Sequence, residues 1–139
     1  MTDRNEASKN EGQPKWMTVT GWVLTVGVAA MLAMSAIGKL AGAEAVQEQL
    51  VEHLGFTTES ARAIGIIELV CVVFFVIPQT RVLGATLIAA YLGGAVCAHL
   101  RVGDPVDQIA PAIVIGGVAW LALVFRDRAI RRLTPVARG

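Results

Sequence analysis

The feature that most constrains this chain is a succession of four apolar runs within 139 residues. A helix needs about 20 mainly apolar residues to cross a hydrocarbon core about 30 Å thick. Four such runs leave too few polar residues to cover a buried soluble core. We therefore predict an all-α fold, an integral membrane four-helix bundle whose spans cover approximately residues 16–38, 61–77, 82–100 and 109–125.

The composition agrees with a chain whose solvent is partly lipid. Only 17% of the residues are charged, whereas a soluble domain carries about 25%. The formal net charge of +1 gives no basic field that would recruit nucleic acid. The sequence also has no metal-ligand spacing, phosphate-binding loop or nucleophile elbow. We therefore predict no nucleic-acid partner and no metal site.

The distribution of basic residues predicts the orientation in the membrane. Lys and Arg concentrate in the loops and tails on the cytoplasmic side. In the predicted topology, the two tails and the turn after the second span hold nine of the twelve basic residues. We expect both termini in the cytoplasm, with residues 1–15 as a disordered tail and residues 126–139 as a basic tail.

The connection between the first two spans has the pattern of a short amphipathic helix on the outer side. Its apolar stripe has the spacing of one helical face, and Gly55 can end the helix. The acidic residues on the other face indicate either a solvated face, on a helix lying along the membrane, or a docking face for a basic partner. The apolar stripe comprises Ala43, Val46, Leu50 and Leu54, and the acidic face comprises Glu44, Glu48 and Glu52.

Glu68 is the most informative polar residue inside a predicted span. It precedes Pro78, where the second helix must end, by ten positions, which places it about 15 Å from the inner end, near the middle of the bilayer. Ionisable residues at this depth usually face the bundle interior and mark a function. The alternative is a protonated or paired Glu that only ties helices together. Tyr91 lies at nearly the same depth in the third span and is the best depth-matched partner.

Two further polar residues are expected to lie near Glu68 and Tyr91. Side chains lean toward the N-terminus of their own helix, so Lys39 and His99 lean inward while Glu68 leans outward. The four residues then converge on the outer half of the bundle as a candidate ligand-binding cluster. The alternatives are that Lys39 only snorkels to the interface, that His99 binds a backbone carbonyl, and that Tyr91 only packs.

Small residues in the spans support packing and not redox chemistry. Cys71 and Cys97 differ in depth by about 12 Å, more than the ~7 Å between Cα atoms that a disulfide spans, so we expect no bond between them. Gly93 and Gly94, with Ala98, form a small-residue pattern that predicts close helix approach.

Several segments together resemble the DoxX-like membrane proteins. The sequence SAIGKL at 35–40 resembles their Gly-x-x-Lys-Leu signature, with Ala36 where many members have Gly, and GIIELV at 65–70 resembles Gly-x-x-Glu-Leu. GGAVCAHLRVGDP at 93–105 resembles their third-span motif, and Pro111 then opens the fourth span. The resemblance implies a four-helix bundle of the bacterial cytoplasmic (inner) membrane, in which Lys39, Glu68 and His99 match the polar positions of the family.

The resemblance leaves several functions open, because fold alone does not fix a reaction. The family is named for its similarity to the membrane subunit of a thiosulfate:quinone oxidoreductase, and other members look like assembly or redox-homeostasis partners. Our first interpretation is an accessory or scaffold subunit that binds a quinone-like or lipid ligand and a membrane or periplasmic redox protein. The alternatives are a membrane subunit of a quinone-linked oxidoreductase, with quinone as its cofactor, and a small proton-coupled transporter. The sequence shows no complete catalytic set, and a homodimer is compatible with it.

Overall fold

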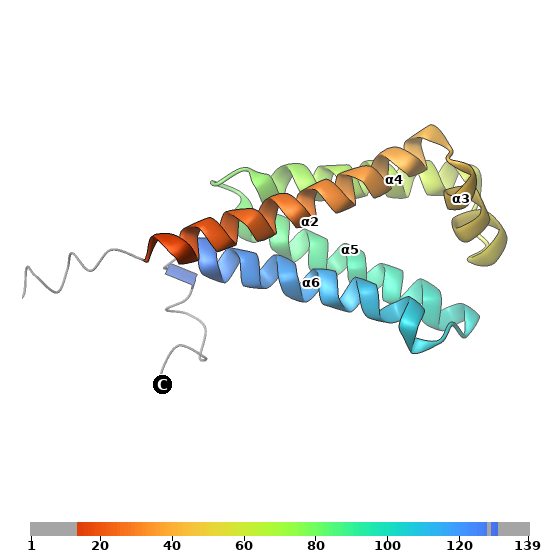
Figure 1. The fold of residues 1–139 in the computed structure, drawn as a ribbon. Helices are drawn as coiled ribbons and strands as arrows, with labels where there is room; N and C mark the ends of the chain where they lie inside the picture. The colour runs from red at the N-terminus through yellow and green to blue at the C-terminus, as the bar shows by residue number, and fades with distance from the viewer. Residues whose placement is uncertain (1–13, 128, 131–139) are drawn as a thin grey trace, which may run out of the picture.

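The computed structural model describes residues 14–127, 129 and 130. Within them lie four long helices, and a shorter helical segment joins the first two long helices (Figure 1). Of the predicted tails, residues 1–13, 128 and 131–139 lie outside the described residues, whereas Lys15 begins the first long helix and Arg126 ends the last one. The long helices are α2 (Lys15–Ala41), α4 (Thr58–Val76), α5 (Arg81–Val102) and α6 (Val106–Arg126), and the shorter segment consists of α3 (Glu44–Gln47) and the π-helix η1 (Glu48–His53).

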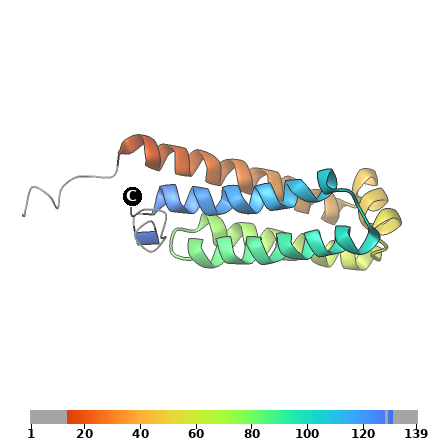
Figure 2. The same cartoon turned by 90° about the horizontal axis from the view of Figure 1, so that it is seen from below.

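The long helices form a ring in which each packs on two others. α2 packs on α4 and α6, and α5 packs on the same two helices; the turned view accordingly shows α6 between α2 and α5 (Figure 2). We call the end with the start of α2 and the α4–α5 turn the proximal end. The other end, with α3, η1 and the α5–α6 turn, is the distal end. The prediction of an all-α chain is confirmed for the described residues.

The surface of the bundle is apolar enough for lipid. Three helices, α2, α5 and α6, are long and apolar enough to cross a membrane. Large apolar side chains point outward from them, including Met34, 74% exposed, and Ile113, 62% exposed, an arrangement that a soluble monomer avoids. α4 is 19 residues long and carries three charged side chains. The fourth crossing and the orientation therefore stay predictions.

The helix boundaries have local causes. The Thr57 side chain accepts a hydrogen bond of 3.1 Å from the Ser60 amide and caps α4. Pro78 ends the helix as predicted, because Ile77 before it is extended. The prediction that Pro111 opens the fourth span is wrong. α6 already begins at Val106, after Pro105, so Pro111 lies inside the helix and only removes one amide donor.

The proximal half of the bundle is closely packed. Phe75 and Ile88 are completely buried, and Leu123 is 1% exposed. A Cβ atom built on Gly84 would lie 2.2 Å from the Phe75 amide nitrogen, and one on Gly21 would lie 2.8 Å from a backbone nitrogen of α6. These two glycines therefore let α5 approach α4 and α2 approach α6.

The glycines expected to bring helices together lie elsewhere. Around Gly93 and Gly94, no heavy atom of the described chain lies within 4 Å of an added Cβ. The prediction of close helix approach at this pair is therefore wrong. Gly94 lines the cavity, and both glycines are exposed, so neither lies at a contact between two helices of the described chain.

Polar contacts close the proximal end. Arg81 Nε donates a hydrogen bond of 2.9 Å to Asp127 and forms an ion pair with it. Burial raises the pKa of the Asp127 carboxyl, but hydrogen bonds from Arg81 and the Ala129 amide outweigh this effect, so its pKa lies below the usual range. Arg126 lies 4.1 Å from the centroid of the Trp22 ring, a cation–π contact between α6 and α2.

The predicted amphipathic helix is present, with two corrections. It is α-helical only at residues 44–47 and continues as a π-helix, which sequence periodicity does not predict. Its apolar residues Val46, Leu50 and Leu54 line a cavity inside the bundle, so the stripe does not serve only to hold a helix on the membrane surface. The acidic face, Glu44, Glu48 and Glu52, is exposed as expected.

Candidate functional site: a cavity in the distal half

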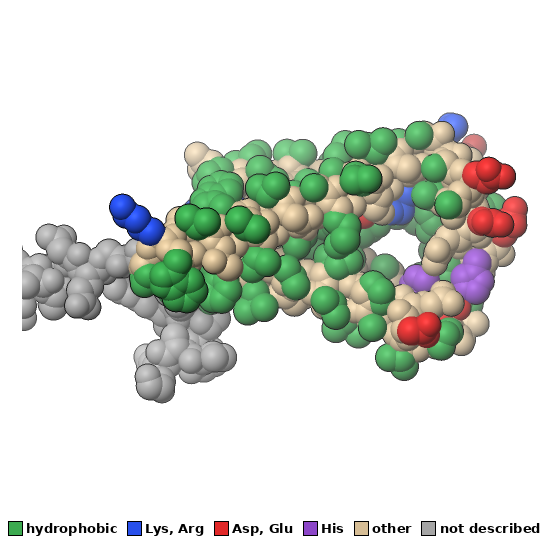
Figure 3. All heavy atoms as spheres, viewed as in Figure 1, with side chains coloured by type: hydrophobic (Ala, Val, Ile, Leu, Met, Phe, Trp, Pro, Cys, Tyr) green, Lys and Arg blue, Asp and Glu red, His purple; other side chains and the backbone are tan. Residues whose placement is uncertain are grey.

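A cavity of about 740 Å³ occupies the distal half of the bundle, beneath α3 and η1. In the space-filling view an opening passes between the helices at this level, with histidine side chains on its distal border (Figure 3). Apolar side chains of all four long helices form most of the wall. Each predicted site residue lines the cavity, so the cluster shares one space: these residues are Lys39, Glu68, Tyr91 and His99, joined by the polar side chains of Ser35, Gln49 and Gln108.

A buried ion pair lies in the wall between α2 and α4. The Lys39 ammonium is 2.7 Å from Glu68 Oε2, and the two side chains are only 10% and 2% exposed. Lys39 also donates a hydrogen bond of 2.5 Å to the Ser35 hydroxyl, which donates one of 3.3 Å to Glu68. A Cβ on Gly65 would lie 2.9 Å from Lys39 Cβ, so this glycine lets the two helices come close enough to pair.

Both charges of this pair are buried, so its stability depends on how well the pairing offsets the loss of hydration. Removing two charges from water is costly, and only good geometry with additional hydrogen bonds offsets that cost. Here the hydroxyl of Ser35 supplies such a bond to both partners. The pair joins α2 to α4 at a point where both side chains are largely buried. It also makes this part of the wall neutral overall while leaving polar atoms beside the cavity.

Tyr91 reaches the same space from α5. It packs against the buried core on one side, and its hydroxyl is close enough to Glu68 to interact with the carboxylate. The ion-pair partner of Glu68 is Lys39, and the sequence prediction did not give that pairing. Helix depth placed these residues at the right level, but it could not indicate that α2 and α4 are neighbours with Lys39 turned toward Glu68.

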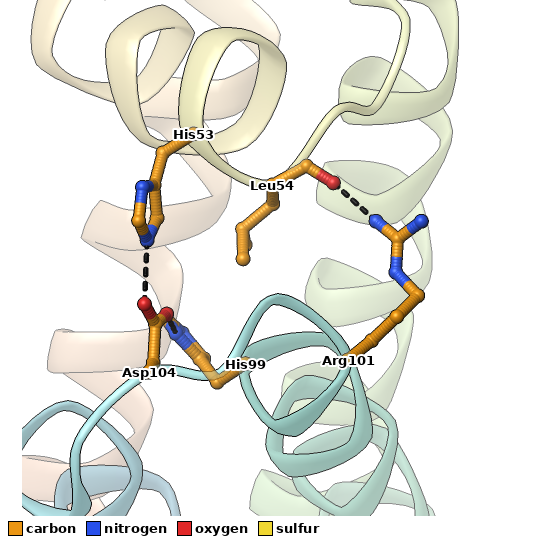
Figure 4. Close-up of polar contacts among 5 residues, drawn as sticks. All are labelled: His53, Leu54, His99, Arg101 and Asp104. Carbon is orange, nitrogen blue, oxygen red and sulfur yellow. Dashed lines mark hydrogen bonds and ion pairs between the residues drawn. The ribbon is translucent and has the colours of Figure 1, made fainter.

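A second polar group lies at the distal end of the cavity (Figure 4). Asp104, in the α5–α6 turn, lies 2.5 Å from His99 Nδ1 through one oxygen and 2.7 Å from His53 Nε2 through the other. Its side chain is 5% exposed. The hydrogen bond with His99 is the main cause that holds the pKa of Asp104 below its usual range, and the bond with His53 adds to it.

The predicted cluster is therefore divided into two groups. Lys39 and Glu68 pair in the wall, with Tyr91 beside them, whereas His99 is engaged by Asp104 nearer the distal end. The sequence prediction missed Ser35 and Asp104. Ser35 had a usable signal, because it lies one helical turn before Lys39. Asp104 had only its position in the turn that follows His99.

The cavity wall offers several side chains that can bind and orient a molecule. The side chains offer an ammonium, a carboxylate, a phenol, hydroxyl and amide groups, and one imidazole, that of His99. No group of His, Cys, Asp and Glu in the described part of the chain could hold a metal ion. Cys71 is buried and Cys97 exposed, and both are free thiols, as their difference in depth predicts.

Long apolar helices around a cavity with a mostly apolar wall indicate a helical membrane protein. The model of the DoxX-like family matches residues 23–122, which extend from the first part of α2 into the last turns of α6. The chain therefore belongs to the DoxX-like family and is a membrane protein of that family, and the suspected resemblance is confirmed. Neither the curated proteins nor the solved structures gave a match.

Proposed function

We propose that this protein binds an uncharged amphipathic molecule, quinone-like or lipid, in the distal cavity, and that it does so as an accessory or scaffold subunit. The observation that carries the proposal is a cavity of about 740 Å³ with a largely apolar wall and a single buried ion pair, Lys39–Glu68, in that wall. Ligand sites are typically concave and mostly apolar, with a few polar groups that fix orientation.

The polar groups favour a head group that accepts hydrogen bonds. A Lys ammonium has three donors; two of those on Lys39 are directed to Ser35 and Glu68, which leaves one for an occupant. Tyr91 adds a hydroxyl, and Gln108 adds an amide nearer the distal end. A quinone ring carries two carbonyl acceptors on opposite sides and suits donors placed at two levels. Because Lys39 and Glu68 neutralise each other, a charged head group would lack a counter-charge in this wall.

The position of the cavity supports supply from the membrane. It lies between helices whose outer surfaces are apolar, and the opening in Figure 3 faces sideways from the bundle. A lipid-soluble molecule can reach such an opening without crossing water. In the sequence, the two tails and the turn after the second span hold nine of the twelve basic residues, which supports a cytoplasmic location for the proximal end. The cavity would then lie in the outer half of the inner membrane.

The side chains of the described cavity wall support the proposal of an accessory role. Its side chains can bind and orient a head group, but a redox reaction also needs an electron donor, and a partner protein would supply it. The exposed acidic face of α3 and η1 is the surface available for such a partner at the distal end. The oxidoreductase-subunit and transporter alternatives, and a homodimer, stay predictions of the sequence.

The test is mass spectrometry of the protein purified in mild detergent, once under native conditions and once after solvent extraction. We expect a stoichiometric quinone or other small amphipathic molecule in the unmodified protein. Glu68→Gln should lose the bound molecule, because the positive charge of Lys39 is then no longer neutralised beside the cavity. Glu59→Gln makes the same chemical change on the exposed surface of α4 and should retain it. A protein that carries only bulk lipid, with no difference between the two variants, would contradict the proposal.

A further inference from the structure

The segment of residues 43–54, which contains α3 and η1 and which we call the lid segment, covers the distal end of the cavity. Glycines with positive φ bracket it: Gly42 has φ 68° and Gly55 has φ 72°. Residues with a side chain rarely adopt this conformation, so the chain makes a sharp change of direction at both ends of the segment. Two such joints allow the segment to turn as a unit relative to α2 and α4.

The underside of the lid segment belongs to the cavity wall. Val46, Leu50 and Leu54 point toward the space, and Leu54 is only 4% exposed. In Figure 4 the Leu54 side chain extends from the end of η1 into the gap between the two groups of polar contacts. The apolar stripe therefore separates the cavity from the polar surface of the distal end.

Polar contacts hold the free side of the lid segment to the opposite helices. The segment is continuous with α2 and α4, whereas the contacts in Figure 4 join it to α5 and the α5–α6 turn. Asp104 accepts from His53 of the lid and His99 of α5 at the same time. On the other side, the Arg101 guanidinium donates to the Leu54 carbonyl and lies 5.9 Å from the Phe56 ring centroid. Hydrogen bonds can break and re-form without disturbing the packed core.

The form of η1 agrees with a segment that has to move. π-Helical turns are rare and occur often at functional sites. Here the Leu54 amide donates to the Gln49 carbonyl and the Phe56 amide to the Leu50 carbonyl. The wider turn places His53 and Leu54 next to each other over the cavity, with one directed to Asp104 and the other into the wall.

We propose that the lid segment is a door between the cavity and the aqueous phase at the distal end, and that Asp104 holds it shut by bridging His53 and His99. The door gives the cavity a second entrance, separate from the sideways opening to lipid. The inference goes beyond the proposed function, because it depends on the cavity and its cover and not on which molecule binds there.

The experiment measures solvent access to the cavity in membranes. A single cysteine is placed at Ala95, which lines the cavity on α5, in a chain whose Cys71 and Cys97 are replaced by Ala. The protein is reconstituted in lipid vesicles and treated with a methanethiosulfonate that carries a quaternary ammonium, which does not enter the hydrocarbon core. We expect slow labelling in this parent protein and labelling at least five-fold faster when Asp104→Asn is added.

The matched control is Asp107→Asn, which makes the same change at an exposed position at the start of α6 and should leave the rate unchanged. His53→Gln, at a side chain that is 46% exposed, keeps the test valid should Asp104→Asn fold poorly, and it should also accelerate labelling. Equal labelling rates in the parent, Asp104→Asn and His53→Gln proteins would contradict the proposal that the lid segment opens. A failure of quinone binding would not affect this result, because the reagent reports water access alone.

Discussion

The two halves of this bundle are built from the same four helices but are packed in opposite ways. In the proximal half, Phe75, Ile88 and Leu123 fill the interior, and Gly84 brings two helices into contact. In the distal half the same helices separate around about 740 Å³ of space. α4 shows the contrast within itself, because Glu68 and Phe75 are two helical turns apart.

The difference teaches where such a small membrane protein can place costly groups. Stability in a structure is not uniform, and sites that bind or move are drawn from its less stable parts. A buried ion pair and a histidine–aspartate group weaken a fold unless other regions compensate. The proximal half supplies that compensation through close packing, so the distal half can keep a cavity and polar side chains.

The largest effect is expected where helices touch most closely. Gly84→Val places a branched side chain where a Cβ would already lie 2.2 Å from backbone, and we expect no folded monodisperse protein in size-exclusion chromatography. Gly93→Val is the control on the same helix, since no described heavy atom lies within 4 Å of its added Cβ. Folding of both variants to the same extent would contradict the contrast between the two halves.

The next effect concerns the ion pair of the distal half. Lys39→Met leaves Glu68 buried without its cation and should lower the free energy of unfolding by about 3–5 kcal/mol. The double variant Lys39→Met/Glu68→Leu removes both charges and should recover most of that loss, because an apolar pair can replace a buried ion pair. Thermal unfolding in one detergent measures all three proteins. A double variant as unstable as the single one would show that the pair itself, and not the orphaned charge, stabilises the bundle.

A smaller effect separates filled from empty space along one helix. Ala85 is completely buried in the packed half, so Ala85→Leu should destabilise by about 1–3 kcal/mol through overpacking. Ala98 lines the cavity, and Ala98→Leu should change stability by less than about 0.5 kcal/mol while reducing ligand occupancy. The free energy of unfolding and the ligand occupancy by mass spectrometry are therefore both measured for each variant. Equal destabilisation by both substitutions would mean that the cavity is not open in the membrane.

The smallest effect is the pH dependence at the proximal end. The pKa of Asp127 is lower in the folded protein than in the unfolded chain. Its contribution to the free energy of unfolding is therefore complete above the unfolded pKa of about 3.9. That contribution is lost as pH falls through the lower pKa of the folded protein. Because the Arg81–Asp127 pair is partly exposed, with side chains 31% and 12% accessible, the contribution is at most about 1 kcal/mol. Asp127→Asn should reduce the acid loss of stability seen in unfolding between pH 5 and 3, values that bracket about 3.9.

Much of the fold could be read from the sequence, because helix length and hydrophobicity leave few alternatives in lipid. The apolar runs predicted each long helix to within a few residues, and Pro78 ended α4 as expected. Depth along the helices placed Lys39, Glu68, Tyr91 and His99 at one cavity. Depth is a single coordinate, however, and it does not say which helices are neighbours or how each is rotated.

The missed features depend on that rotation and on tertiary packing. Lys39 and not Tyr91 pairs with Glu68 because α2 packs on α4 with Gly65 between them. Asp104 can contact His53 only because the α5–α6 turn lies beside η1 in the folded bundle, which the sequence does not indicate. Gly93 and Gly94 have the same small-residue pattern as glycines that bring helices together, yet they border open space. Sequence spacing alone cannot distinguish these two uses of glycine.

The packed half also sets a boundary for whatever occupies the cavity. Phe75, Ile88 and Leu123 close the space halfway along the helices, so the proposed occupant would contact the lipids of one leaflet only. Its supply then depends on the composition of that leaflet and on how fast the molecule flips from the other. A lipid that is confined to the opposite leaflet would be excluded by depth, whatever its head group.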